Sequence, residues 1–299
     1  MRHQDARTAF LAGLIDDAGL FPPARLPMDE ALAAHLATKR GPYGWAVSRF
    51  GCPAGRLAEI PPELPLRLSV VVDGVGDLAL VHRFAARARV ELLEAPLAAL
   101  RGFVDAIDSS GIPGPVQPVF EIPPTEIDAG LAALAELRAE RDWTGTCRAP
   151  WAKIRCGGLT ADAFPPPERL AAFIATAARL GVPFKATAGL HQPFRHVAAD
   201  TGFTHHGFVN VVAASVFAQR CDQPLLRALI EDGDPAHFSL TREGLRWNEL
   251  VAPAAAVAAS REHALTAYGS CSTDEPLEAL DRIGALPPTL PPTTLEVQA

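Results

Sequence analysis

The segment 152–190, AKIRCGGLTADAFPPPERLAAFIATAARLGVPFKATAGL, contains the alternation that determines the predicted fold. Residues 152–155, AKIR, and 183–186, PFKA, are predicted to be short strands. Between them, residues 167–180 carry apolar side chains at helical spacing, begin at a proline and are followed by Gly181, a common residue after a helix. The segment therefore predicts a strand, a helix and a second strand parallel to the first.

The same alternation extends in both directions along the chain. The predicted strands are residues 12–15, 45–50, 68–72, 90–94, 116–121, 152–155, 183–186 and 208–212. The predicted helices between them are residues 28–40, 77–88, 98–109, 125–141 and 167–180. Eight strands alternating with helices favour an α/β protein with a closed (β/α)8 TIM barrel over an open sheet. A dinucleotide fold is weakly supported, because the GVG at 74–76 lacks the third glycine of that motif.

The boundaries of the predicted barrel follow from the same pattern. We expect the barrel to span residues 1–235 and a C-terminal helical extension to span residues 236–286, with helices at 248–268 and 275–283. GSCSTDEP at 269–276 is interpreted as the start of the second of these helices. Residues 287–299 are rich in proline and are predicted to be a disordered tail.

Composition excludes several classes of protein. The chain has 299 residues, a net charge of −7 and no cluster of basic residues, which argues against a nucleic-acid partner. It has no run of about 18 apolar residues, so we expect no membrane partner. Asp16 and Asp17 interrupt the N-terminal apolar stretch, which argues against a secretory signal and predicts a cytoplasmic protein.

The five cysteines include no C-x-x-C pair, which is typical of reduced thiols and not of a zinc site or a disulfide framework. The expected partner is a small-molecule substrate, and a homo-oligomer is left open.

Lysine is unusually scarce. Lysine and arginine together number 27, and only Lys39, Lys153 and Lys185 are lysines. Where a positive charge alone is needed, this chain uses arginine, so a retained lysine can mark chemistry that a guanidinium cannot perform.

Polar residues occur at most of the predicted strand ends, and in a (β/α)8 barrel the C-terminal strand ends form the catalytic face. These residues are Asp16, Asp17, Arg49, Asp73, Glu94, Glu121, Lys153, Arg155, Lys185 and Asn210. Buried charges cost several kcal/mol unless they are paired or functional. The set therefore predicts a polar site in which Asp16, Arg49, Asp73, Arg155 and Asn210 contact the substrate.

The two lysines of this set, Lys153 and Lys185, stand on adjacent predicted strands and should project into the same mouth. Two ammonium groups close together disfavour charging both, and a neutral lysine amine can form a Schiff base with a carbonyl compound. The alternative is structural, with both lysines paired to Glu94, Glu121 or Asp73.

The stretch 153–200 resembles the deoxyribose-phosphate aldolase family of class I aldolases. KIRCGG at 153–158 and PFKATAGL at 183–190 are similar to the "IKTSTG" and "GFKPAGG" strands of that family, and RVELLEAPLAAL at 89–100 looks like its "VDVVFP" strand. The resemblance implies Lys153 as the Schiff-base lysine, Lys185 as the neighbour that lowers its pKa, and Glu91 or Glu94 as a proton relay.

The chain also departs from the family pattern. Arg155 and Cys156 replace small hydroxyl residues, and AGLHQP at 188–193 replaces the double-glycine phosphate turn. Position at the strand end favours Glu94 over Glu91 as the relay, with Glu121 as a further candidate. The predicted activity is that of a lyase or isomerase acting on a small carbonyl compound without a cofactor, in which Arg49, Arg155 and His191 hold the substrate.

Four histidines suggest a rival function. His191, His196, His205 and His206 lie near the last two predicted strands, and with Asp16 or Glu121 they could bind a metal in a barrel hydrolase or isomerase. The chain has no H-E-x-x-H motif, and we therefore predict no metal ligands. The remaining alternative is a barrel that binds a metabolite without catalysis.

Overall fold

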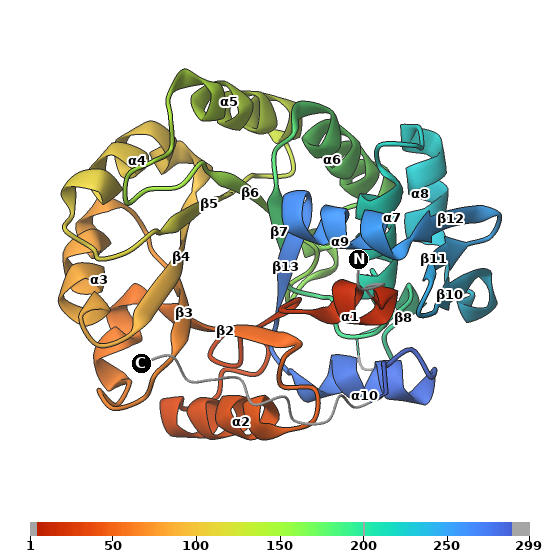
Figure 1. The fold of residues 1–299 in the computed structure, drawn as a ribbon, viewed down its shortest axis with the longest axis horizontal. Coiled ribbons are helices and arrows are strands. Elements are labelled where there is room, and N and C mark those ends of the chain that lie inside the picture. Colours follow the sequence, from red (N-terminus) through yellow and green to blue (C-terminus); the bar gives the residue numbers. More distant parts are fainter. Residues whose placement is uncertain (1–4, 200, 289–299) are drawn as a thin grey trace.

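The computed structural model describes residues 5–199 and 201–288, which form a closed barrel of eight parallel strands inside a coat of helices (Figure 1). The predicted (β/α)8 TIM barrel is therefore confirmed. The strands follow one another around the barrel in the order β1, β13, β7, β6, β5, β4, β3 and β2. Their bounds are β1 Ile15–Asp17, β2 Val47–Pro53, β3 Arg67–Val71, β4 Arg89–Pro96, β5 Gln117–Glu121, β6 Trp151–Arg155, β7 Phe184–Thr187 and β13 Leu265–Ser270.

The helical coat begins and ends where the sequence signals lie. Helix α2 follows Pro27 and has Asp29 and Glu30 in its first turn, where the helix dipole favours acids. Helix α6 ends at Gly181, whose φ of 64° is left-handed. The α-helices of the coat are α1 Ala6–Leu11, α2 Met28–Arg40, α3 Leu78–Ala85, α4 Leu100–Ser109, α5 Ile127–Glu140, α6 Pro167–Leu180, α9 Ala254–His263 and α10 Asp274–Arg282.

Short 3-10 helices complete the connections. Between β2 and β3 the chain forms η1, Ala54–Glu59, in place of an α-helix. The others are η2 Val75–Asp77, η3 Leu97–Ala99, η4 Ala161–Ala163 and η5 Pro235–His237. No helix within the described residues is long and apolar enough to cross a membrane.

The apolar core lies between the strands and the helices, not along the barrel axis. Phe103 on α4 packs edge-to-face on Phe120 of β5, with ring centroids 6.0 Å apart. Phe173 on α6 packs in the same way on Phe184 of β7, at 5.2 Å. Since side chains alternate along a strand, the residues next to these aromatics point into the barrel, and many of them are charged.

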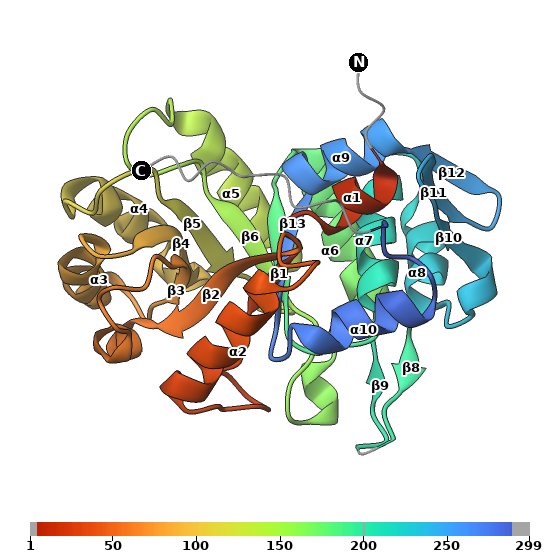
Figure 2. The same cartoon turned by 60° about the horizontal axis from the view of Figure 1, so that its bottom comes forward.

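A large insertion separates β7 from the last barrel strand (Figure 2). It contains an antiparallel hairpin, two helices and a three-stranded antiparallel sheet. Its elements are β8 His196–Val197, β9 Thr204–His205, α7 Phe208–Phe217, α8 Gln223–Glu231, β10 Phe238–Leu240, β11 Gly244–Trp247 and β12 Leu250–Pro253.

The predicted eighth strand, residues 208–212, is wrong, because this segment lies within helix α7. All ten residues of α7 are buried, and a helix that is apolar on every side has the same short apolar run as a buried strand. The eighth strand is β13, so the barrel continues well beyond residue 235, and residues 236–286 are not solely a helical extension.

The two helices predicted after residue 235 differ in outcome. The helix expected at 248–268 is only Ala254–His263, whereas α10 agrees with the helix expected at 275–283. Of the expected tail, residues 289–299 lie outside the described residues.

Because residues 208–212 are helical, Asn210 is not at a strand end and does not face the barrel mouth. Its Oδ1 accepts a hydrogen bond from the backbone N–H of Arg195 at 3.0 Å. Its Nδ2 donates to the backbone oxygens of Leu229 at 2.8 Å and Asp232 at 2.7 Å. Asn210 therefore joins α7 to α8 and to the loop after β7, which is a structural position and not the expected substrate contact.

We expect Asn210→Ala to lower the free energy of unfolding by about 2–3 kcal/mol, because it leaves buried backbone groups without partners. Urea denaturation measures this change. Gln223→Ala, at an exposed position on α8, is the control and should change stability by less than about 0.5 kcal/mol. An unchanged denaturation midpoint for Asn210→Ala would contradict this role.

Candidate functional site

The two lysines predicted to share a site do so. Lys153 on β6 and Lys185 on β7 are register partners, so their side chains leave the sheet on the same side. Both side chains point into the barrel, where Lys185 contacts Asp16 of β1 and Glu94 of β4. Only 7% of the Lys153 side chain and 3% of the Lys185 side chain are exposed.

Glu94 lies between the two lysines. Its Oε2 is 2.8 Å from Nζ of Lys153, and its Oε1 is 2.6 Å from Nζ of Lys185. Ser69 Oγ on β3 donates a further hydrogen bond to Oε1 at 2.5 Å. One buried carboxylate thus accepts hydrogen bonds from three strands, and it is the relay residue that the sequence favoured.

Toward the mouth of the barrel, the charges continue from Lys153 to Glu121 and Arg155. Lys153 Nζ is 2.9 Å from Glu121 Oε2, and Arg155 Nε donates to Glu121 Oε1 at 3.2 Å. The Glu121 side chain is 31% exposed and that of Arg155 is 48% exposed. These two residues therefore separate Lys153 from solvent.

Toward the opposite end of the barrel, the charges continue from Lys185 to Asp16 at 2.5 Å and from Asp16 to Arg49 at 3.3 Å. Arg49 Nε lies 2.9 Å from Glu91, which also pairs with Arg67 at 2.8 Å.

We call the whole set of charged residues, from the mouth to the opposite end of the barrel, the interior charge network. It comprises Asp16, Arg49, Arg67, Arg89, Glu91, Glu94, Glu121, Lys153, Arg155 and Lys185.

Two small residues of β13 leave room for part of this network. Strand β13 stands between β7 and β1, and its Ala267 and Gly269 are the register partners of Lys185 and Asp16. With so little side-chain volume between them, Lys185 spans β13 and contacts Asp16 directly. A Cβ at Gly269 would lie 3.1 Å from Oγ1 of Thr187, so this level of the barrel has little space for a larger residue.

Charges of opposite sign set the protonation of the buried groups. Burial alone would raise the pKa of Glu94, but the attraction of Lys153 and Lys185 outweighs it and holds this pKa well below its ordinary value. Burial alone would lower the pKa of Lys153, but Glu94 and Glu121 outweigh it and raise this pKa. The expectation that Lys185 lowers the pKa of Lys153 is therefore wrong for the resting site, because Glu94 lies between the two ammonium groups.

The other predicted substrate contacts lie in different places. Arg49 is in the first half of β2, because this strand extends to Pro53, three residues beyond its predicted end. It faces Asp16 and Glu91 and is remote from the mouth, which corrects the expected strand-end position. Asp73 is exposed in the loop after β3, where its backbone N–H donates to Asp77.

The four histidines do not converge on one point. His206 Nε2 is hydrogen-bonded to the backbone oxygen of Pro165 at 2.7 Å. The rings of His196 and His205 lie 5.4 Å apart on the β8–β9 hairpin. His191 lies at the barrel mouth, where its Nδ1 is 3.1 Å from Glu275. Within residues 5–199 and 201–288, no group of three His, Cys, Asp or Glu side chains is arranged to hold a metal ion.

Sequence reasoning missed Cys271, which contacts His191 through its Sγ. It directly follows β13, whose first four residues belong to the helix that the sequence predicts at 248–268. The alternating run LTAYGS at 265–270 followed by a helix start is the signal that identifies it.

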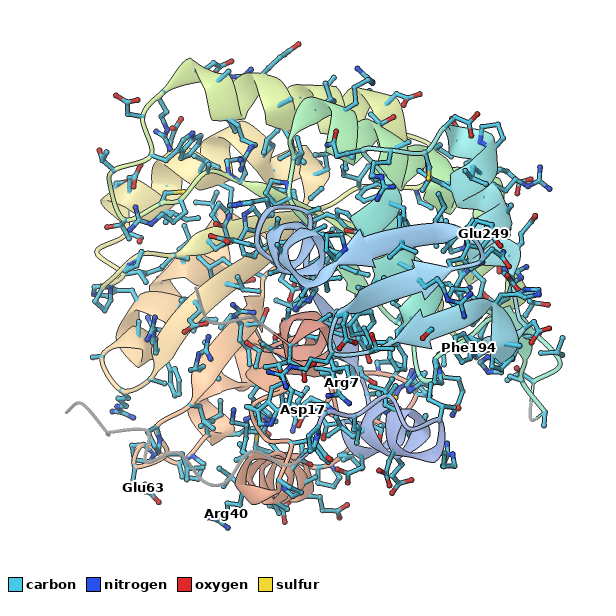
Figure 3. The ribbon with its side chains drawn as sticks, turned by 45° about the vertical axis from the view of Figure 1, so that its right-hand side comes forward. Arg7, Asp17, Arg40, Glu63, Phe194 and Glu249 are labelled. Carbon is cyan, nitrogen blue, oxygen red and sulfur yellow. The ribbon has the colours of Figure 1, made fainter. Side chains whose placement is uncertain are left out.

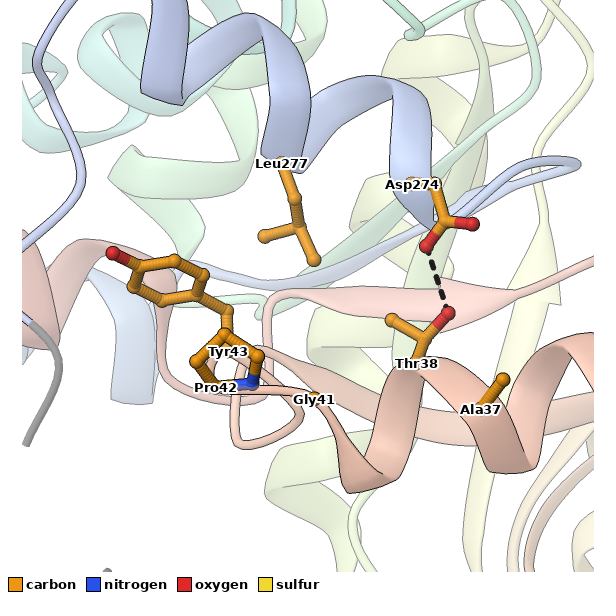
Figure 4. A pocket seen from close by; sticks show the side chains of 7 residues that line it. All are labelled: Ala37, Thr38, Gly41, Pro42, Tyr43, Asp274 and Leu277. Carbon is orange, nitrogen blue, oxygen red and sulfur yellow. Dashed lines mark hydrogen bonds between the residues drawn. The ribbon is translucent and has the colours of Figure 1, made fainter. Parts of the chain in front are cut away.

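Two cavities lie outside the barrel wall. One, of about 320 Å³, lies between the C-terminal end of α2 and helix α10, where Thr38 donates a hydrogen bond to Asp274 at 2.8 Å (Figure 4). The other, of about 490 Å³, lies between the sheet β10–β12 and the end of α10 and includes Phe194, which Figure 3 labels. In the same view Arg40, Glu63 and Glu249 lie at the periphery, whereas Glu94, Lys153 and Lys185 of the network are buried. No residue of the interior charge network lines either cavity.

Replacing Glu94 by glutamine keeps its size but leaves Lys153 and Lys185 without their shared counter-ion. We expect Glu94→Gln to lower the free energy of unfolding by about 3–5 kcal/mol, measured by urea denaturation. Glu59→Gln is the matched control, because Glu59 pairs with Arg56 at the surface and should contribute little. Equal midpoints for the two variants would refute a central role of Glu94.

The pH dependence of stability should follow the lowered pKa values of Glu91, Glu94 and Glu121. A carboxyl with a lowered pKa in the folded state stabilises the fold above its unfolded pKa of about 4.3, and this contribution is lost as the pH falls through the folded pKa. The free energy of unfolding should therefore decline as the pH falls below about 5 and should continue to decline toward the lowered folded pKa values. It should decline less steeply in Glu94→Gln, and parallel curves for the two proteins would contradict this linkage.

We also compared the chain with models of known protein families, with curated proteins and with solved structures. None of these comparisons found a match. The function of the site must accordingly be inferred from its own residues and their contacts.

Proposed function

We propose that this barrel is a lyase or isomerase that acts on a small carbonyl compound through a Schiff base on Lys153. The observation that supports this proposal is the position of Glu94, which bridges Lys153 and Lys185 at 2.8 Å and 2.6 Å. A nucleophilic lysine needs a group that removes its proton, and Glu94 is in direct contact with it.

The proposed first step balances within the site. The ammonium of Lys153 transfers a proton to Glu94, and the neutral amine attacks the carbonyl carbon of the substrate. The carbinolamine that forms then loses water, with Glu94 returning the proton to the departing oxygen, and a protonated imine remains. The imine withdraws electrons from the neighbouring carbon, which permits cleavage of a carbon–carbon bond or transfer of a proton there.

Lys153 is preferred to Lys185 because of its position relative to the mouth. It lies beneath Glu121 and Arg155, both of which are partly exposed. Lys185 lies deeper, held between Glu94 and Asp16, where its ammonium orients the Glu94 side chain that also contacts Lys153. Lys185 is therefore a positioning residue in this proposal.

Arg155 indicates the class of substrate. Its Nε and Nη2 contact Glu121 at 3.2 and 3.4 Å, a pair that is open to solvent. An anionic group of the substrate can replace Glu121 on this guanidinium, since arginine binds carboxylates and phosphates through two parallel hydrogen bonds. We therefore favour a carbonyl compound with a carboxylate or phosphate group.

The raised pKa of Lys153 favours a second candidate function. A lysine that is fully paired with Glu94 and Glu121 is protonated at rest, as it would be in a barrel that binds a metabolite without catalysis. The Schiff-base proposal requires proton transfer to Glu94 when substrate enters, whereas the binding barrel requires no neutral amine at any time.

Reductive trapping separates the two candidates. The protein is incubated with acetaldehyde, dihydroxyacetone or pyruvate and reduced with sodium borohydride, and mass spectrometry of a digest locates the adduct. We expect an adduct on Lys153, because it lies directly beneath the partly exposed Glu121 and Arg155, whereas Lys185 lies deeper between Glu94 and Asp16. Lys153→Arg should abolish this adduct, because a guanidinium stays protonated.

Two variants serve as controls for the trapping experiment. Lys39→Arg should trap at the parent rate, because Lys39 donates to the backbone oxygens of Gly44 and Val47 and is far along the chain from the site. Lys185→Arg keeps the positive charge beside Glu94 and should trap at a reduced rate. Labelling of Lys39 alone, or no labelling of Lys153 by any of the three compounds, would favour the metabolite-binding barrel.

A further inference from the structure

A second group of reactive side chains lies at the mouth of the barrel. Sγ of Cys271 is 3.6 Å from Nε2 and 3.9 Å from Nδ1 of His191. The same imidazole also contacts a carboxylate, since its Nδ1 is 3.1 Å from Oε2 of Glu275. A thiol, an imidazole and a carboxylate thus stand in the order of a nucleophile, its base and the group that orients the base.

The fold brings these three residues together from separate segments. His191 is in the loop after β7, and Cys271 directly follows β13, the neighbour of β7 in the barrel. Glu275 is in the first turn of α10, where its backbone N–H donates to Oγ of Ser272. The loops that follow the strands form the catalytic face of a (β/α)8 barrel, so the group occupies that face.

This group is distinct from the lysine site. Cys271 is four residues beyond Ala267, the register partner of Lys185. At the usual rise, four residues span about 13 Å along the strand direction, which in a (β/α)8 barrel is tilted by about 36° to the barrel axis. The chemistry of Cys271 is therefore independent of the proposed role of Lys153.

The environment of Cys271 requires a base. Burial, with a smaller contribution from the charge of Glu275, raises the pKa of this thiol to about 11. The resting side chain is a thiol, and its proton must be removed during the reaction. His191 is in position to accept it, and Glu275 stabilises the imidazolium that forms.

We propose that Cys271, His191 and Glu275 form a nucleophilic thiol centre that accepts an acyl group from an activated ester or thioester. Sγ attacks the acyl carbon while its proton passes to His191, and a carbon–sulfur bond forms. The bond from the acyl carbon to the leaving oxygen or sulfur then breaks, and His191 protonates the leaving group. A water molecule, deprotonated by His191, hydrolyses the resulting thioester and regenerates the thiol.

The other cysteines provide an internal comparison. Cys52, Cys147 and Cys156 are buried, and burial raises the pKa of each thiol to about 12. Cys221 is half-buried, as Cys271 is, but within the described part of the chain it has no hydrogen bond to a histidine. Cys221 is therefore the matched control for the effect of His191.

The test uses p-nitrophenyl acetate at neutral pH. We expect release of p-nitrophenolate together with an acetyl group on Cys271, located by mass spectrometry after an acid quench and removable by hydroxylamine. Cys271→Ala should abolish this acetylation. His191→Ala and His191→Gln should each slow it at least about tenfold, because general-base catalysis typically contributes two or more orders of magnitude.

Two further measurements make the result decisive. Cys221→Ala should leave the acetylation of Cys271 unchanged, because Cys221 is not paired with His191. Glu275→Gln should slow acetylation less than the His191 variants do. The proposal is overturned if Cys271 is not acetylated, if Cys221 is acetylated equally fast, or if both His191 variants react at the parent rate.

Discussion

The carboxylate of Glu94, held between the ammonium groups of Lys153 and Lys185, is the contact on which the interior of the barrel depends. An isolated ion in this position would cost several kcal/mol, so each charge has a neighbour of opposite sign. The alternation begins at Arg155 near the mouth and continues to Arg67 at the other end. Oppositely charged side chains on different strands must lie at the same height in the barrel in order to pair. The register of the strands is therefore linked to the charges of the inward-facing residues.

Much of this fold could be predicted from the sequence, because most of its signals are local. Helices α2 and α6 have the predicted bounds, since proline, acidic residues and glycine mark their ends. The eighth strand could not be assigned in the same way. The run FVNVV is rich in β-branched residues and belongs to a helix buried on all sides, whereas LTAYGS contains small residues that pack in the barrel wall. Tertiary burial overrode propensity in both segments.

The sequence predicts which residues of the candidate site meet, because they lie near the ends of neighbouring strands. It does not predict how far from the mouth of the barrel each residue lies. Lys153, Lys185 and Glu94 meet as expected, because adjacent parallel strands bring their ends together. The depth of Arg49 depends on three residues at the end of β2, and boundaries are the least certain part of any assignment from sequence. The sign of the pKa shift at Lys153 depends on which group lies between the lysines, and only three-dimensional contacts define that.

The position of β13 also constrains the order in which the chain can fold. Ile15 of β1 pairs with Tyr268 of β13, so the two ends of the sequence meet at one seam of the barrel. The salt bridge between Asp16 and Lys185 spans this seam, with β13 between its two strands. The barrel therefore cannot close until β13 lies between β1 and β7. Contacts of such long sequence separation form slowly. The edges that wait for β13 carry Asp16, Asp17 and Lys185, and charged residues on a strand edge oppose pairing with other chains.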